Sequence, residues 1–156
     1  MAECILPPHP LPKAITAPQL FLAGSIDMGR AENWQAKVAH FFELDALIIL
    51  NPRREDWNPN WKQMIDHPEF RAQVEWELAA MEQANQILMY FAAESLAPIT
   101  LLELGLMARS GKLTVVCAPE YWRRGNIEVI CERFGLPLFT QLETTLPLLR
   151  DRLLGA

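Results

Sequence analysis

The sequence predicts an α/β fold: a single-domain, doubly wound parallel sheet of about five strands with helices on both faces. Short apolar runs alternate with longer segments in which apolar residues recur at helical spacing, which is the pattern of successive βαβ units. The chain has 156 residues, of which 51% are hydrophobic and 21% charged, and this is enough for one domain with a hydrophobic core.

The first half of the domain begins with a buried strand. Gln19–Ala23 is a compact apolar run, and Gly24-Ser25 after it predicts a turn. Aromatic and aliphatic side chains then recur at roughly helical spacing over Glu32–Leu44, which predicts a helix. A second apolar run, Ala46–Leu50, predicts the next strand, and Asn51-Pro52 ends it.

A long polar and aromatic segment, Asn51–Pro68, follows the second strand. It is too long for a simple connection, so we predict a functional loop that includes a short helix in one interpretation. Phe70 begins a regular apolar stripe that predicts a helix over Glu69–Ala84. The run Gln86–Phe91 predicts the third strand, in the middle of the chain.

The second half repeats this alternation. A helix that contains Glu103 runs to about Ser110, where Gly111 supplies a C-cap, and Leu113–Cys117 predicts the fourth strand. The last predicted elements are a helix over Ile127–Phe134, a short strand near Leu136–Phe139 and a helix over Leu142–Leu154. The expected arrangement is that of a Rossmann-like or flavodoxin-like sheet.

Composition limits the classes of partner and site. Residues 1–17 contain four prolines and are predicted to form an extended arm before the domain, residues 18–156. A net charge of -5 argues against nucleic-acid binding, and the absence of a long apolar stretch argues against a membrane segment. The histidines lack metal-ligand spacing, so no metal is expected. The three cysteines are far apart, which suggests reduced thiols in a cytoplasmic protein.

Glu103 is the most informative residue, because it interrupts the apolar run Ile99–Met107. An ionised carboxylate is costly to bury unless something binds it or uses it. It lies on a helix past the end of a strand, where open α/β sheets bind ligands, and the helix dipole would keep it ionised there. This position favours a role for Glu103 as a nucleophile or a general base. The alternative is structural, because Thr100-x-x-Glu103 has the spacing of a capping box.

A second carboxylate would complete a site for glycosyl transfer, which typically uses two. Glu77 is the candidate, on the helix that leads into the third strand. Its neighbour Glu75 is equally acidic, and the sequence does not separate the two. The alternative for Glu77 is a solvated residue on the outer face of its helix.

Other polar residues follow the first two predicted strands. Amide, guanidinium, carboxylate and indole groups in the long loop suit hydrogen bonding to a nucleobase and stacking on it, although an ordinary surface loop is also compatible. The predicted substrate-binding residues there are Asn51, Arg53, Asp56 and Trp57. After the first strand, Ser25 or Asp27 could contact a sugar hydroxyl.

Taken together, these residues resemble the nucleoside 2-deoxyribosyltransferases. The resemblance rests on Phe21–Ser25, on Glu75–Leu78, and on Leu102–Gly105 followed by Gly111-Lys112. It covers roughly residues 19 to 128. It implies an α/β fold and exchange of the nucleobase of a 2′-deoxyribonucleoside through a covalent deoxyribosyl-enzyme, with retention. It implies neither a metal nor an organic cofactor.

The resemblance also implies residue roles. Glu103 would be the nucleophile, Glu77 would handle the proton of the base, and Asp56 or Asn51 would be the polar residue of the loop. Asn126 would reach the active site of a neighbouring subunit in a homo-oligomer whose active sites lie near subunit interfaces. The family's usual acid six residues before the nucleophile is Ala97 here, with Glu94 nearby as a substitute, and Leu20 or Phe21 replaces its usual tyrosine.

Two other functions stay open at this stage. The first is an N-glycoside hydrolase acting on nucleosides or nucleoside 5′-monophosphates, with a phosphate bound by residues such as Ser95, Arg53, Arg54 and Arg123. The second is a non-catalytic nucleotide-binding module that retains the fold. In each case the expected partner is a nucleoside or nucleobase rather than a nucleic acid or a membrane.

Overall fold

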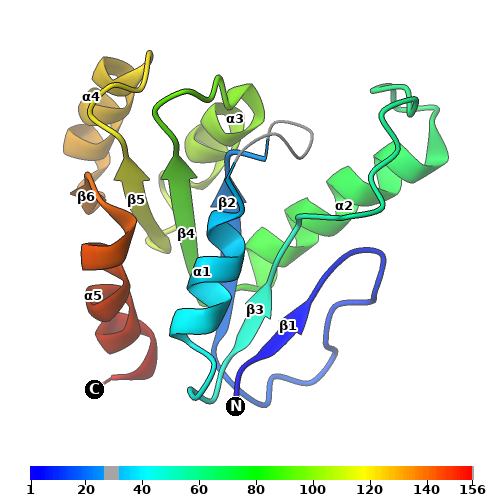
Figure 1. Cartoon of the computed structure of the whole chain (residues 1–156), viewed down its shortest axis with the longest axis horizontal. Helices are drawn as coiled ribbons and strands as arrows, with labels where there is room; N and C mark the ends of the chain where they lie inside the picture. The colour runs from blue at the N-terminus through cyan, green and yellow to red at the C-terminus, as the bar shows by residue number, and fades with distance from the viewer. Residues whose placement is uncertain (27–31, 156) are drawn as a thin grey trace.

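The computed structural model describes residues 1–26 and 32–155 and shows one parallel sheet covered by helices on both faces (Figure 1). The sheet has six strands in the order β1-β3-β2-β4-β5-β6. The strands are β1 (Glu3–Ile5), β2 (Gln19–Gly24), β3 (Ile48–Leu50), β4 (Gln86–Phe91), β5 (Leu113–Cys117) and β6 (Leu138–Phe139). The predicted α/β class and doubly wound parallel sheet are therefore confirmed.

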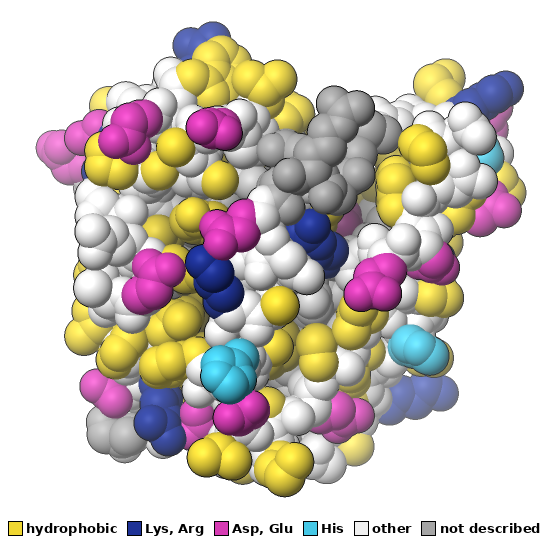
Figure 2. Space-filling view, viewed as in Figure 1, with side chains coloured by type: hydrophobic (Ala, Val, Ile, Leu, Met, Phe, Trp, Pro, Cys, Tyr) yellow, Lys and Arg dark blue, Asp and Glu magenta, His cyan; other side chains and the backbone are white. Residues whose placement is uncertain are grey.

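Two helices cover one face of the sheet and three cover the other (Figure 1). The first pair is α1 (Trp34–Phe41) and α5 (Leu142–Leu154), and the second group is α2 (Pro68–Gln83), α3 (Pro98–Met107) and α4 (Arg124–Phe134). Alternate residues of β2 enter the two cores: Leu20 and Leu22 pack on the side of α1, while Phe21 and Ala23 pack on the side of α2. Figure 2 shows acidic side chains spread among hydrophobic and uncharged groups on the side of α1 and α5.

The sixth strand, β1, lies within the segment predicted to be an extended arm. It pairs in parallel with β3, with Cys4 opposite Ile49, and forms one edge of the sheet. The chain that follows β1 is held against α2, because Trp76 Nε1 donates to the carbonyl oxygen of His9 at 2.8 Å. Three residues followed by closely spaced prolines carry too little pattern to predict a strand, so the expected count of about five was one short.

Several helix ends differ from those predicted. Helix α3 starts at Pro98, and Ala97 before it has a left-handed backbone with φ 46°. Its C-cap is Ala108, so Gly111, predicted to be the C-cap, instead lies in the turn beyond, with φ 73°. Helix α4 starts at Arg124, which places Asn126 inside the helix rather than in the preceding loop.

The carboxyl ends of the parallel strands meet at one edge of the sheet. β2 pairs with β3 on one side and with β4 on the other. The chain passes from β2 to β3 in one direction along the sheet and continues from β4 to β5 in the opposite direction, so the strand order reverses between β2 and β4. Such a switch point is where doubly wound sheets form ligand sites. The loop after β3 contains turns but no helix, and with the first turns of α2 it projects beyond this edge (Figure 1).

Candidate active site

The ends of β2 and β4 form a closely packed base for the candidate site. The Ser25 backbone N–H donates to the carbonyl oxygen of Tyr90 at 3.1 Å, and the Ala92 N–H donates to the Ser25 hydroxyl oxygen at 3.2 Å. Ser25 is buried, and its carbonyl oxygen accepts a hydrogen bond from the indole N–H of Trp34 at 3.0 Å. The Ser25 hydroxyl thus joins two strands within the protein. Asp27, the other candidate here, lies outside the described residues.

Glu103 lies in the second turn of α3 and is 8% exposed. The helix starts at Pro98 with no side-chain cap hydrogen bond, and Thr100 is inside the helix, so the capping-box interpretation is wrong. Burial, followed by the nearby charge of Glu77, raises the pKa of Glu103 to about 8. The helix dipole was expected to keep this carboxylate ionised, but its effect fades beyond the first turn and burial outweighs it.

Glu77 is the carboxylate that α2 brings to Glu103. Burial raises the pKa of Glu77 to about 7, and a hydrogen bond from Gln73 opposes that rise. Glu75 points elsewhere: it is exposed and forms an ion pair with Arg71 on its own helix, 3.7 Å between Nε and Oε1. The structure therefore distinguishes two acids that the sequence could not separate.

Two neighbouring carboxyls with raised pKa values, one buried and one half-buried, titrate as a pair. Burial opposes the loss of each proton, and the first negative charge to form opposes the second. Around neutral pH the pair can therefore hold one proton and one negative charge. That is the composition needed by a reaction in which one carboxylate attacks carbon and the other donates a proton to a leaving group.

The loop after β3 is organised largely by its own contacts. The Asn51 side chain accepts a hydrogen bond from the Arg53 backbone N–H at 3.0 Å, forming an Asx turn at the strand end. The Arg53 guanidinium donates to the carbonyl oxygen of Glu32 and to the Gln35 side-chain oxygen, 3.2 Å in each case. This contact ties the loop to α1.

Further along the loop, Arg54 binds the Asp56 carboxylate through two hydrogen bonds of 2.9 Å. This contact lowers the pKa of Asp56, whose side chain is exposed and lines an open pocket of about 390 Å³ beside the segment that follows β1. Trp57 packs edge-on against Trp61 with ring centroids 4.9 Å apart, and its indole N–H is buried with no partner among the described residues.

The remaining predicted residues lie around α3 and α4. Ser95 is buried in the loop between β4 and α3, and its backbone N–H donates to the carbonyl oxygen of Ala92 at 3.2 Å. Asn126 lies on the exposed side of the first turn of α4, outside the Glu77 and Glu103 pair. Ala97 is buried at the start of α3, whereas Glu94 is exposed.

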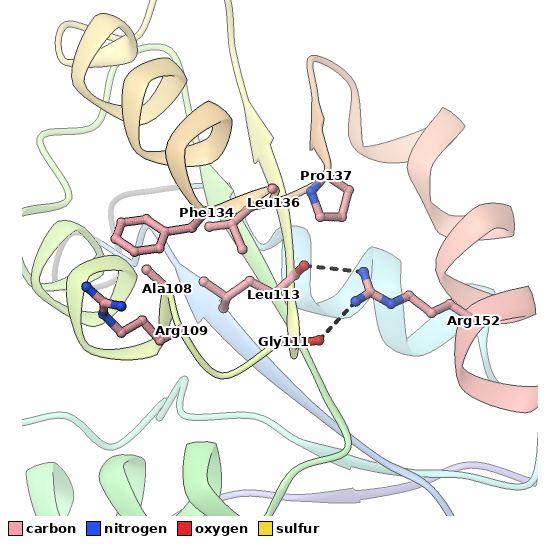
Figure 3. Close-up of a pocket in the computed structure, with 9 residues that line it drawn as sticks. Ala108, Arg109, Gly111, Leu113, Phe134, Leu136, Pro137 and Arg152 are labelled. Atoms are coloured by element: carbon pink, nitrogen blue, oxygen red, sulfur yellow. Dashed lines mark hydrogen bonds between the residues drawn. The ribbon is translucent and has the colours of Figure 1, made fainter.

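A separate pocket of about 340 Å³ lies where the strands begin, at the other end of the sheet (Figure 3). It is lined by residues at the ends of α3 and α4, at the start of β5 and on α5. Figure 3 shows the Arg152 guanidinium directed to the carbonyl oxygens of Gly111 and Leu113, at 3.0 and 3.4 Å. Arg109 lies 5.0 Å over the Phe134 ring. These contacts join secondary-structure elements and do not converge on an open space.

One residue of the site was missed by the sequence argument. Gln73 is 5% exposed, and its amide donates to the Glu77 carboxylate at 3.1 Å. The signal was available, because residues four apart on a helix share a face, and Gln73 precedes Glu77 by four.

The described residues show neither a metal centre nor a membrane-spanning helix. Within residues 1–26 and 32–155, no cluster of three or more His, Cys, Asp or Glu side chains is arranged to hold a metal ion. In the same described part of the chain, no helix combines the length and the apolar character needed to span a bilayer.

These features define a class: a doubly wound α/β protein in which a buried carboxyl, Glu103, is paired with the half-buried Glu77 on the helices that cover one face of its sheet. A family model described as nucleoside 2-deoxyribosyltransferase like matches residues 17–121, which is more than half of the chain and includes both carboxylates. The chain therefore belongs to the nucleoside 2-deoxyribosyltransferase-like family, as the resemblance predicted. No curated protein matches its sequence.

Proposed function

We propose that this protein is a nucleoside 2-deoxyribosyltransferase, which exchanges the nucleobase of 2′-deoxyribonucleosides through a covalent deoxyribosyl-Glu103 intermediate. The observation that carries the proposal is the pairing of buried Glu103 with half-buried Glu77 within the segment that matches the family. Burial suits the chemistry, because a carboxylate removed from water interacts strongly with the positive charge of an oxocarbenium-like transition state.

In the first half of the reaction, a Glu103 carboxylate oxygen forms a bond to C1′ as the bond from C1′ to the base nitrogen breaks. The electron pair of that bond goes to the base, and Glu77 supplies the proton that neutralises it. In the second half, a nitrogen of the incoming base attacks C1′, releases Glu103 and returns a proton to Glu77. Two inversions at C1′ give overall retention.

Three candidate substrate-binding residues fit this proposal by position. Asn51 and Trp57 lie in the loop that overhangs the carboxyl edge, and Ser95 lies just before the helix that carries Glu103. We assign the loop to the nucleobase, because it offers an indole ring and amide groups for stacking and hydrogen bonding.

We also propose that the protein assembles as a homo-oligomer through α3. Exposed apolar side chains form a stripe along this helix, and the flanking loops extend it. They are Leu96, Ile99, Leu102, Leu106 and Trp122. The Trp122 indole N–H donates to the carbonyl oxygen of Leu96 at 3.1 Å, which holds Trp122 beside the N-terminal end of the stripe. An apolar stripe of this kind suits a second copy of the same surface. Asn126 on the neighbouring α4 would then lie near a partner's site.

The test is an exchange assay with deoxyinosine as donor and adenine as acceptor. The proposal predicts deoxyadenosine, detected by chromatography, and no product from Glu103→Gln. Free deoxyribose or its phosphate without exchange would identify a hydrolase instead. Binding of nucleosides without turnover, unchanged by Glu103→Gln, would identify a non-catalytic module.

A further inference from the structure

Gln73 connects the loop after β3 to one of the two proposed catalytic carboxylates. Its Nε2 donates to the carbonyl oxygen of Pro52 and to Oε1 of Glu77, 3.1 Å in each case. Pro52 lies at the start of the loop that we assign to the nucleobase, whereas Glu77 is on α2. One buried amide thus connects the start of this loop to the helix that carries Glu77.

The orientation of this amide is fixed by its neighbours. A carbonyl and a carboxylate are both acceptors, so the NH₂ end and not the oxygen must face them. The other end is left without a partner, because Gln73 Oε1 is buried and unpaired within the described part of the chain. Such an acceptor costs free energy. A residue that only filled space here, such as methionine, would avoid that cost, so the two donated bonds are the reason for an amide.

The bond to Glu77 acts on the charge of that carboxyl. Hydrogen bonding from Gln73 favours the ionised form and opposes the rise in pKa that burial causes. The charge of Glu77 in turn raises the pKa of Glu103 on α3, so the orientation of Glu77 matters to both carboxyls. No salt bridge to Glu77 is formed by a described residue, so the Gln73 amide is the main group that holds its orientation.

We propose that Gln73 is a positioning residue, whose amide fixes the Glu77 carboxyl facing Glu103 and ties that orientation to the loop at Pro52. The inference deepens the proposed function and rests on it for the role of Glu77. Gln73 acts through Glu77 and has no step of its own in the proposed reaction. It acts by keeping the Glu77 carboxyl in one rotamer.

The experiment compares three variants. Gln73→Met keeps the length of the side chain and removes both donors, while Gln73→Glu keeps its shape and places another acid beside Glu77. The matched control is Gln83→Met, on the same helix, because Gln83 Nε2 donates to the carbonyl oxygen of Pro12 at 2.8 Å and does not bond to Glu77. Each protein is measured by base exchange across pH and by ¹³C carboxyl NMR titration of Glu77.

We expect Gln73→Met to raise the Glu77 pKa by about half a unit or more and to lower kcat about tenfold, as for a lost hydrogen bond to a charged group. The KM for deoxynucleoside should change much less, and the alkaline limb of the kcat profile should move upward. Gln83→Met should match the wild type. If Gln73→Met does not fold, Gln73→Glu is expected to raise the Glu77 pKa instead, through like-charge repulsion.

The result that overturns the inference is a Glu77 titration and a kcat that Gln73 variants leave at wild-type values. This outcome is separable from failure of the proposed function. If the wild type exchanges no base while Gln73→Met still shifts the Glu77 titration, then the transferase proposal fails and the positioning contact stands. If the wild type exchanges bases and Gln73→Met behaves identically, only the positioning role fails.

Discussion

Glu77 on α2 lies close enough to Glu103 on α3 for its charge to raise the pKa of Glu103, in addition to the larger effect of burial. The two helices are separate in the sequence and are brought together because both cover the same face of the sheet. The protein thus holds two carboxyl groups close together, and the charge of either one opposes ionisation of the other. This arrangement should cost stability and supply reactivity at the same place.

Replacing Glu103 with glutamine should stabilise the protein at alkaline pH. The folded protein retains the Glu103 proton up to a pKa of about 8, whereas the unfolded chain releases it near the ordinary value of 4.5. Between these values the unfolded state binds fewer protons, so the stability of the wild type falls as pH rises. Glutamine is neutral throughout and escapes this loss.

The measurement is the unfolding temperature of wild type and Glu103→Gln between pH 5 and pH 9. The two should be similar at pH 5 and should separate by several degrees at pH 9, since about 1 kcal/mol corresponds to 2–4 °C at this size. The exposed Glu75→Gln variant is the control and should follow the wild type. Parallel curves for Glu103→Gln and wild type would show that Glu103 titrates normally.

Glu77→Gln should slow base exchange by about 10²-fold or more, the usual contribution of a general acid. The effect should appear mainly in kcat and should be smallest for donors whose base leaves readily without a proton. Glu75→Gln removes an equally acidic neighbour and should retain activity within about twofold, because its ion pair with Arg71 is exposed. Equal losses in the two variants would contradict the assignment of Glu77.

The sequence was sufficient for most of the fold because buried parallel strands are short continuous apolar runs. β4 and β5 begin and end at the predicted residues, as does α5. The sequence was insufficient for β1, in which two of the three residues are exposed at the sheet edge and the strand forms by pairing with β3. Pairing of this kind depends on a partner more than forty positions away, and no local pattern records it.

For the site, the sequence indicated Glu103 because a carboxylate within an apolar run is unusual, whichever face of the helix packs against the sheet. It could not choose between Glu75 and Glu77, since the face that α2 buries depends on how the helix docks on the sheet. The sequence also could not predict the direction of the Glu103 pKa shift. That direction is decided by burial and by a second helix, whereas the sequence offered only the local helix dipole.

Gly24→Ala should destabilise the protein, because the end of β2 has no room for a side chain. A Cβ there would lie 2.5 Å from the carbonyl oxygen of Tyr90 and 2.7 Å from Cζ2 of Trp34. Backbone and a buried indole cannot both move away cheaply, so we expect a loss of about 1–3 kcal/mol in the free energy of unfolding. Gly125→Ala is the control: it is in a helix with nothing within 4 Å and should cost no stability. Denaturant unfolding measures both, and equal stability for the two variants would contradict the close packing at Gly24.

Leu102→Gln should weaken self-association if the apolar stripe on α3 is the subunit interface. Leu102 is 60% exposed and lies at the centre of the stripe, so glutamine should not disturb the core. Burying a leucine contributes about 1.5–3 kcal/mol, and in a two-fold symmetric interface each substitution counts twice. The dissociation constant should therefore rise more than about tenfold, because 1.4 kcal/mol corresponds to that factor.

Light scattering over a dilution series gives the dissociation constant directly. Leu148→Gln on α5 is the matched control, since Leu148 is similarly exposed at 52% but lies on the other face of the sheet. If the wild type is a monomer, or if both variants dissociate alike, the interface does not lie on α3.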